Sequence, residues 1–507
     1  MPSSFRSAFA SWLVVLSFVG ILAAGAANAA GGDSLTIAYP ADVPNWDPQN
    51  QTSGPAMSIL NCVFDTPLGQ TPDMKLIPRA IAEWHWSADK MALDVRMRDD
   101  MYFHNGDKVT ANDLKFTFDR YKKETLAQSA TYRRVKEVVV KSDTEATFIL
   151  AEPFATLPAR LSIFGSAILP KAYIEKVGMT EFMAHPIGSG PYRIVSYNRD
   201  ARLVLEAFDK YWAGPAPIKN VTIEIVKDPT ARVAAIEAKR IDLTVDVPIR
   251  AITRLAQVQG LTAQALPYPA QLQLLMISER GAFKDQNVRL AVHHAIDKAA
   301  LSKAFYNGVA KPISVLSPPG FPGDTPGFNF EFSEAKAKEL LAKSGFSTAK
   351  PVKIDFMTTN GVYANDFDVA RAIVQMLKKV GIDANLEVIE LAKYFELNHS
   401  NKLPEMTLFH WSNPTGDPEI YPGGVLDSNR PFSAWKGKEA GDTVAKLFAE
   451  TDEAKRVAGY AAFNQRAVEQ GWIIPLLQPV MTIVYKANLD FTPYQTGWLS
   501  VNTIKWK

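Results

Sequence analysis

The sequence is nearly free of cysteine and of excess charge. Cys62 is the single cysteine in 507 residues, which excludes an intrachain disulfide and a cysteine-rich metal site. The chain has 55 lysine and arginine residues against 53 aspartate and glutamate residues. This balance lacks the basic excess that electrostatically driven nucleic-acid binding requires. We therefore expect an ordinary apolar core and no nucleic-acid partner.

Long apolar runs are also scarce, because only residues 12–24 form one. Arg6 precedes this run as the only charge before Asp33, and an Ala-x-Ala sequence ends at residue 29. A basic start, an apolar middle and a small-residue end predict a secretory signal peptide over residues 1–29. The small-residue end disfavours the alternative, a retained anchor helix. We expect a mature chain exported to the periplasm, without direct membrane insertion.

The rest of the chain alternates predicted strands and helices, which indicates an α/β fold. Apolar residues at helical spacing predict a helix over 369–380, between strands at 352–357 and 382–389. This order implies a parallel pair with a right-handed crossover. One helix is predicted from residue 287 toward 306, and residues 406–411 are typical of a buried strand. With 33 dispersed prolines and no low-complexity linker, domains built from discontinuous segments are expected.

Two helix starts carry clear capping signals. Thr110 is followed three residues later by Asp113, the spacing of a capping box. Asp228 precedes Pro229, which predicts an N-cap followed by proline at the first helical position.

No sequence motif indicates catalysis. Zinc-protease and phosphate-loop signatures are missing, and the Gly-Ser-Gly triplet at 188–190 has the spacing of neither a nucleophile elbow nor a dinucleotide fingerprint. That triplet is expected to form a turn. His293 and His294 are adjacent on a predicted helix and point about 100° apart, so they do not easily share a metal. The sequence predicts neither an enzyme nor a cofactor.

Aromatic residues instead gather near predicted strand ends. They are Tyr39, Trp46, Trp411, Tyr421, Trp435 and Tyr494. Aromatic walls with a few placed polar groups are typical of clefts that bind small organic solutes. Core packing is the alternative for each of them taken singly. His410 directly precedes Trp411, and its alternative is a hydrogen-bonded histidine at a strand end.

Five sequence blocks, in order along the chain, resemble one family. They span residues 93–106, 109–120, 186–193, 211–217 and 287–297. The chain resembles family 5 of bacterial extracellular solute-binding proteins, which contains periplasmic oligopeptide-, dipeptide- and nickel-binding receptors of ATP-driven importers. The resemblance implies a two-lobe clamp of the periplasmic-binding-protein type II kind. It also implies an inserted subdomain, so three lobes in all, and a hinge of two strands.

The resemblance implies lobe Ia from residues 30–70, 195–270 and 481–507. Lobe Ib, the insertion, would span 71–194, and lobe II would span 271–480. The expected partners are a small-molecule solute and the membrane subunits of an ABC permease, with the receptor itself a monomer.

We expect the solute to contact a set of cleft residues drawn from two parts of the chain. They are Tyr39, Trp46, His410, Trp411, Asn413, Asp417 and Tyr421. In peptide-binding members of the family, an aspartate a few residues after the tryptophan holds the free amino group of the peptide. Alignment on Trp411 and Asp417 places Pro414 there, and proline has no charge.

A peptide, an opine or a sugar conjugate is the expected solute class, with free peptides disfavoured by Pro414. Asn413 offers a neutral donor and acceptor for amides or hydroxyls. The alternatives are a nickel-type receptor that uses His410 with an exogenous chelator, a secreted hydrolase, and a chaperone-like protein.

Overall fold

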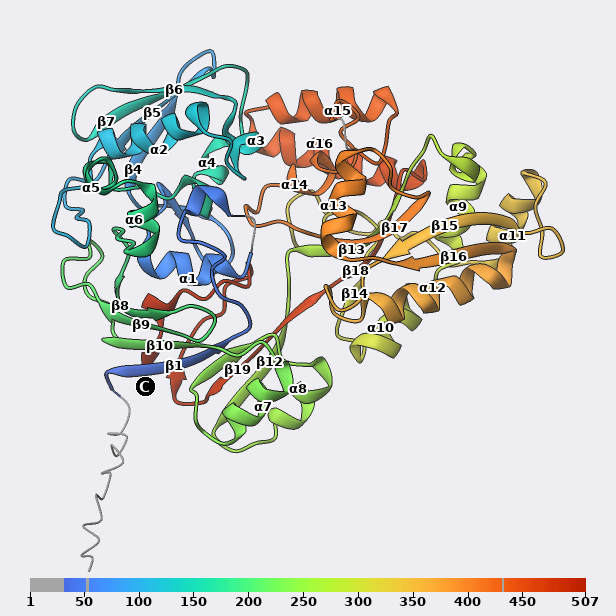
Figure 1. Cartoon of the computed structure of the whole chain (residues 1–507). Helices are drawn as coiled ribbons and strands as arrows, with labels where there is room; N and C mark the ends of the chain where they lie inside the picture. The colour runs from blue at the N-terminus through green and yellow to red at the C-terminus, as the bar shows by residue number, and fades with distance from the viewer. Residues whose placement is uncertain (1–31, 52–53, 431–432) are drawn as a thin grey trace, which may run out of the picture.

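The computed structural model describes residues 32–51, 54–430 and 433–507. The predicted signal peptide lies outside these described residues. Figure 1 shows the chain arranged in two halves. Residues 32–267 and 480–507 form the first half, and residues 270–478 form the second half. No helix in the described ranges combines the length and the apolar character that crossing a bilayer requires.

A seven-stranded sheet is the base of the first half. Its strands, in spatial order, are β12 (Leu261–Pro267), β19 (Val480–Lys486), β11 (Leu243–Val245), β1 (Ser34–Tyr39), β10 (Asn220–Ile225), β9 (Arg202–Ala207) and β8 (Tyr192–Asn198). β1 runs parallel to both of its neighbours, β10 and β11. The helices of this part are α1 (Ala56–Val63), α7 (Pro229–Glu237) and α8 (Ile249–Leu255). Asp228 caps α7 as predicted, because its side chain accepts the Ala231 amide.

A four-stranded antiparallel sheet completes the first half. Its order is β4 (Ile81–Trp86), β5 (Ala92–Met97), β7 (Glu145–Leu150) and β6 (Val135–Val140). The helices that pack into its core are α2 (Ala111–Lys123), α3 (Ser129–Tyr132) and α4 (Leu157–Arg160), whereas α5 (Lys171–Val177) and α6 (Met179–Ala184) pack into the core of the seven-stranded sheet. The capping box predicted at the start of α2 is confirmed, since Asp113 accepts the Thr110 amide at 2.9 Å.

The second half is built on a six-stranded sheet. Its order is β14 (Lys311–Pro312), β18 (Ile473–Gln478), β13 (Ala270–Met276), β17 (Met406–Ser412), β15 (Val352–Thr358) and β16 (Ile382–Val388). Its helices are α9 (Gln286–His294), α10 (Lys298–Tyr306), α11 (Glu334–Lys343), α12 (Asp366–Val380), α13 (Leu391–His399), α14 (Ile420–Gly423), α15 (Lys438–Ala449) and α16 (Glu453–Glu469). The predicted strand–helix–strand unit is β15–α12–β16, and its strands pair in parallel as expected.

Short elements fill the connections. Two small hairpins pair β2 (Leu68–Gln70) with β3 (Leu76–Pro78) and β20 (Leu489–Asp490) with β21 (Lys505–Trp506), and single 3-10 turns lie at Pro48–Asn50, Phe164–Ser166, Gly281–Lys284 and Val501–Thr503.

The single helix predicted over residues 287–306 is wrong, because the chain forms α9 and α10 with a break between them. α9 ends at His294, and Asp297 adopts an extended backbone conformation. The Asp297 carboxylate accepts the Ala300 amide at 2.9 Å and so caps a second helix. A side chain that caps a new helix competes with continuation of the old one.

Only two stretches of the described chain join the halves. One runs from β12 into β13, and the other runs from β18 into β19. They lie side by side, since the Tyr268 amide donates to the Pro479 carbonyl at 3.2 Å. The Gln478 side chain donates to the Tyr268 carbonyl at the same distance. The two halves are therefore connected through a narrow pair of neighbouring strands.

The Gly-Ser-Gly triplet packs directly against the end of α1. A Cβ at Gly188 would lie 2.0 Å from the Val63 carbonyl oxygen, and a Cβ at Gly190 would lie 2.5 Å from the Val63 carbonyl carbon. The Gly190 amide also donates to the Val63 carbonyl. These glycines are needed because two backbones approach closely there.

We predict that Gly190→Ala destabilises the protein by about 1–3 kcal/mol, since the Val63 backbone leaves no room for a methyl group. Urea unfolding measures the change. Gly54→Ala is the matched control, because no atom lies within 4 Å of its Cβ position. Equal unfolding midpoints for the two variants would contradict the prediction.

Candidate binding cleft

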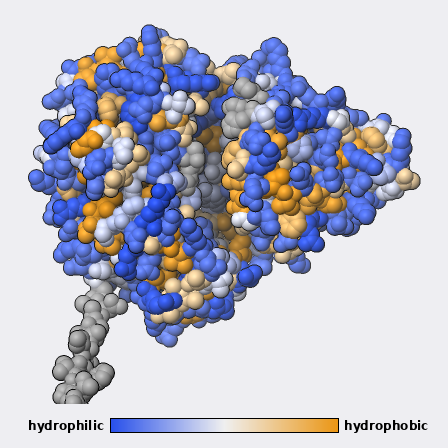
Figure 2. Space-filling view, in the orientation of Figure 1, coloured by the Kyte–Doolittle hydropathy of each residue, from blue (hydrophilic) through white to orange (hydrophobic). Residues whose placement is uncertain are grey.

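A cleft runs between the two halves, and Figure 2 shows it from its open side. At one end the halves enclose a cavity of about 150 Å³. From the first half it is lined by Ala130, Thr131, Arg134, Phe154 and Arg160, and from the second by Trp411, Glu419, Ile420, Gly424, Arg430 and Phe448. Both halves thus contribute walls to one cavity.

An ion pair joins the two halves at this cavity. Arg160 of the first half donates to the Glu419 carboxylate of the second half at 2.6 Å. Glu419 is only 2 % exposed, and Arg430 lies 3.7 Å from its other oxygen. Arg430 also pairs with Asp427 at 3.2 Å. A buried carboxylate requires such partners, because burying an unpaired charge is costly.

Aromatic stacking adds a second contact between the halves at this cavity. Phe154 of the first half stacks on Phe448 of the second with ring centres 5.7 Å apart. The Arg134 guanidinium lies 4.3 Å from the Phe448 ring centre and forms an ion pair with Glu152 at 2.7 Å.

Trp411 enters the cavity from the end of β17. Its indole N–H donates to the Ile420 carbonyl at 2.7 Å, which holds the ring against α14. The close approach depends on Gly424, where a Cβ would lie 2.4 Å from the ring. Trp411 is half-buried, so part of its surface faces the cavity.

The loop after Trp411 is organised by Asn413. The Asn413 side-chain oxygen accepts the Thr415 amide and hydroxyl and the Gly416 amide, and its nitrogen donates to the Asp417 carbonyl at 2.7 Å. Its main-chain amide donates to Pro269, beside the connection between the halves. The buried Asn413 side chain is thus engaged within its own loop.

Asp417 is engaged as well. Its carboxylate pairs with Arg456 of α16 at 2.6 Å, with both side chains under 10 % exposed, and accepts the Glu419 amide. Burial raises the pKa of the Asp417 carboxyl, and the Arg456 charge opposes that rise. Tyr421 is fully buried in the cluster beneath the loop.

His410 lies in a stack of aromatic rings. The ring centre of Tyr363 lies 5.0 Å from that of the imidazole, and the ring centre of Tyr268 lies 6.1 Å from it. The ring planes are nearly parallel in both pairs. Burial lowers the pKa of His410 to about 4, so the imidazole is neutral at pH 7. The Tyr363 loop is fixed by the buried Asp366, whose carboxylate accepts the Gly361, Val362 and Tyr363 amides.

Tyr39 and Trp46 lie in the core of the first half. The Tyr39 hydroxyl donates to Ser58 at 2.8 Å, and the Trp46 ring meets Tyr197 edge to face. Both are less than 5 % exposed.

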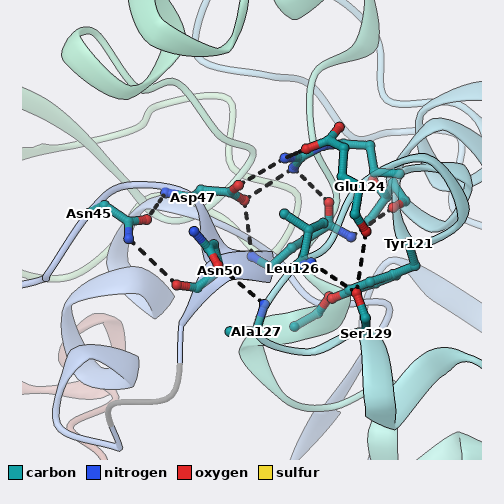
Figure 3. A network of polar contacts seen from close by, with 12 residues as sticks. Asn45, Asp47, Asn50, Tyr121, Glu124, Leu126, Ala127 and Ser129 are labelled. Atoms are coloured by element: carbon teal, nitrogen blue, oxygen red, sulfur yellow. Dashed lines mark hydrogen bonds and ion pairs between the residues drawn. The ribbon is translucent and has the colours of Figure 1, made fainter.

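The chain after Trp46 is held by the polar network in Figure 3. The Asp47 carboxylate accepts two hydrogen bonds from Arg120 of α2, and Asn50 accepts the Ala127 amide at 3.2 Å. This network positions the chain that leads into α3, and so positions one wall of the cavity.

The structure therefore brings His410, Trp411, Asn413, Asp417 and Tyr421 together on one stretch of the second half, whereas Tyr39 and Trp46 pack elsewhere. Sequence analysis missed the cavity residues Arg134, Arg160, Glu419 and Arg430, and the ring partners Tyr268 and Tyr363. No local motif marks the arginines, which meet only when the halves approach. Within the described residues, no group of three or more His, Cys, Asp or Glu is placed to hold a metal ion.

We predict that Asp417→Asn destabilises the protein by about 3–5 kcal/mol, because it leaves the buried Arg456 charge unpaired. Urea unfolding measures the loss. The double variant Asp417→Asn/Arg456→Met should recover part of it, since the unpaired charge is then gone. A single variant as stable as the wild type would contradict the assignment.

We predict that His410 contributes to acid sensitivity. The pKa of His410 is about 4 in the folded protein and 6.5 in the unfolded chain. Between pH 4 and pH 6.5 the unfolded chain therefore binds more protons. Stability is thus lost as pH falls from 6.5 to 4, by up to about 3 kcal/mol for this group. Urea unfolding of His410→Gln should show a shallower loss than the wild type, while the exposed His185→Gln should match the wild type. Parallel curves for His410→Gln and the wild type would contradict the prediction.

Comparison with known proteins gives a consistent result. A family model described as bacterial extracellular solute-binding proteins, family 5 Middle, matches residues 75–432. The di/tripeptide-binding protein 2 of Pseudomonas aeruginosa is 25 % identical over 516 residues, covering 96 % of each chain.

Solved structures share the fold. The periplasmic binding protein DppA of Helicobacter pylori, in complex with the peptide STSA, matches with a TM-score of 0.80 at 22 % identity, covering 94 % of this chain and 98 % of that one. AgaA of A. tumefaciens R10, in complex with agropinic acid, matches with a TM-score of 0.79 at 21 % identity, covering 94 % and 99 %. The expected α/β fold is confirmed. So is the expectation of a binding protein and not an enzyme, because the chain belongs to family 5 of the bacterial extracellular solute-binding proteins.

Proposed function

We propose that this protein is the solute receptor of an ABC-type importer. It binds a peptide-like or other small organic solute between its halves and delivers that solute to a membrane permease. The observation that carries the proposal is a cavity walled by both halves, which in the described residues are connected by two neighbouring stretches of chain. A solute that touches both walls favours the closed form, since it gains contacts there that the open form lacks.

The mature chain is divided into lobes Ia, Ib and II with the ranges expected from the sequence. The segments around Tyr268 and Pro479 act as the hinge between the lobes. Hinges are typically a few residues that absorb the change in backbone angles, and both segments lie between strands.

The solute does not need a free α-amino group. Pro414 carries no charge, and its carbonyl accepts a hydrogen bond from Gln70 at 3.0 Å. The two carboxylates that follow in this loop, Asp417 and Glu419, are already paired with Arg456 and Arg160. An ammonium group would have to displace an arginine. The relatives that bind di- or tripeptides and agropinic acid support a peptide or opine class, and a sugar conjugate fits the same requirement.

The roles of the sequence-predicted residues then differ. Trp411 and His410 contact solute, with Tyr363 and Tyr268 beside them. Asn413, Asp417 and Tyr421 shape and support the loop. Tyr39 and Trp46 support the first half from within its core.

The chain is exported through a cleavable signal peptide, residues 1–29, and acts in the periplasm as a monomer. The permease recognises the closed shape, so no membrane insertion by the receptor is involved.

The test is to identify the solute that co-purifies with the protein. Native mass spectrometry of the purified chain should show a bound small organic molecule, released unchanged on unfolding. Small-angle scattering should show a more compact protein once that molecule is returned to the stripped receptor. Binding that requires nickel and is abolished by EDTA would favour the metal-chelate alternative. Chemical conversion of the molecule would favour the hydrolase.

We predict that Trp411→Ala weakens binding of the co-purified solute by about 1–3 kcal/mol, because the variant removes the indole surface. Isothermal titration measures the change, and Trp411→Phe should retain most of the affinity because it keeps an aromatic face. Unchanged affinity of Trp411→Ala would assign the indole a packing role only.

A further inference from the structure

We propose that the cavity between the halves is a subsite for an oxyanion, a carboxylate or phosphate group of the solute, held by Arg134, Arg160 and Arg430. This inference deepens the proposed function and rests on it, because it names the chemistry of the solute that the cleft takes.

The charge on the cavity wall carries the inference. Three guanidinium groups line the cavity, from Arg134, Arg160 and Arg430, against one carboxylate, Glu419. Two further carboxylates lie next to the lining arginines but do not line the cavity themselves. Glu152 pairs with Arg134, and Asp427 pairs with Arg430.

The three arginines have N–H groups left over that could bind a ligand. A guanidinium has five N–H donors in a rigid fork. Within the described residues, Arg160 uses one side-chain nitrogen, toward Glu419, and Arg134 is paired through its Nε. Arg430 donates through its Nε to Asp427. Carboxylate and phosphate are the groups that such forks bind in bidentate fashion.

Burial makes these donors effective. The side chains of Arg134 and Arg160 are 17 % and 16 % exposed. Burial lowers the pKa of Arg134; the Glu152 charge opposes this change, and the charges of Arg133 and Arg430 add to it. Crowded cations with little solvent are stabilised by an added negative charge. A cationic group would instead face three guanidiniums, and Glu419, the one carboxylate among the described lining residues, is already paired.

The size of the cavity fits such a group. About 150 Å³ equals the liquid volume of roughly five water molecules, enough for a carboxylate or phosphate on a short stem. Phe154, Phe448 and Trp411 supply apolar surface for the stem.

An anion here also couples binding to closure. Arg134 and Arg160 come from the first half and Arg430 from the second, so one oxyanion contacts both. The Asp47–Arg120 and Asn50–Ala127 contacts hold the chain before α3 in place, and so they position the first-half wall of the cavity (Figure 3).

The experiment uses matched probes on the mature protein, stripped of co-purified solute. Four N-acetylated, C-amidated tripeptides share one backbone and carry glutamate, glutamine, phosphoserine or serine in the middle. Two more carry alanine there, one with a free C-terminal carboxylate and the other, its neutral counterpart, with a C-terminal amide. Isothermal titration of each is compared with titration of the solute released from the purified protein, whose charge is measured by mass spectrometry.

We expect the released solute to be anionic, and at least one charged probe to bind about tenfold or more tightly than its neutral counterpart, since charged hydrogen bonds are the stronger ones. The glutamate and phosphoserine probes, and the free C-terminus, distinguish carboxylate from phosphate.

Arg134→Gln and Arg430→Gln should reduce this preference to under about threefold, because each removes a donor fork from the cavity. Arg133→Gln is the matched control: it loses the same charge one residue away, on an exposed side chain that does not line the cavity. Thermal melting checks that each variant is folded. Arg134→Lys gives a second reading, since it keeps the charge and loses the fork.

Equal binding of charged and neutral probes, a neutral or cationic released solute, or equal effects of Arg133→Gln and Arg134→Gln would overturn the oxyanion subsite and leave the receptor function standing. If the protein releases no solute and binds no probe, the receptor function itself fails, and the subsite fails with it.

Discussion

The constraint on which the rest of the structure depends is the narrow connection between its halves. In the part of the chain that the structure describes, two neighbouring stretches link the halves covalently, and they are held together where the Tyr268 amide donates to the Pro479 carbonyl. Each half has its own sheet and its own apolar core, so neither core depends on broad packing between the halves. A cleft between them therefore leaves both apolar cores buried, and charged and aromatic groups can line its walls.

Across that cleft, the electrostatics are organised by two buried carboxylates. Asp417 pairs with Arg456 inside the second half, whereas Glu419, two residues later, pairs with Arg160 of the first half. The first pair fixes the loop and the second joins the halves. Because the Asp417 carboxylate also accepts the Glu419 amide, the loop fixed by one pair positions the carboxylate of the other. A short segment thus combines a structural role with a contact that exists only when the halves are close.

Much of the fold was predictable because local chemistry determines it. The capping box at Thr110, the Asp228 cap and the β15–α12–β16 unit follow from side-chain spacing over a few residues. The break at Asp297 was missed, since apolar spacing continues across it and only the capping carboxylate marks the new start.

Only part of the candidate site could be predicted from the sequence. Residues 410–421 are continuous in sequence, so their proximity was foreseeable. Arg134 and Arg160 reach the cavity through the packing of α3 and α4 against the second half, which no single stretch of sequence encodes. Tyr39 and Trp46 show the converse, because an aromatic residue at a strand end satisfies core packing as well as it would satisfy a cleft.

Trp411 is the point at which these features meet. Its indole N–H is held by Ile420, its ring rests on Gly424, and its exposed part lines the cavity beside the arginines. On the same strand, His410 faces the Tyr268 and Tyr363 rings. Adjacent residues of a strand point to opposite faces, so β17 presents one aromatic group to the charged cavity and the other to Tyr268. The cavity and the connection at Tyr268 are thereby contacted by adjacent residues of one strand. β17 itself is paired on both sides, with β13 and with β15.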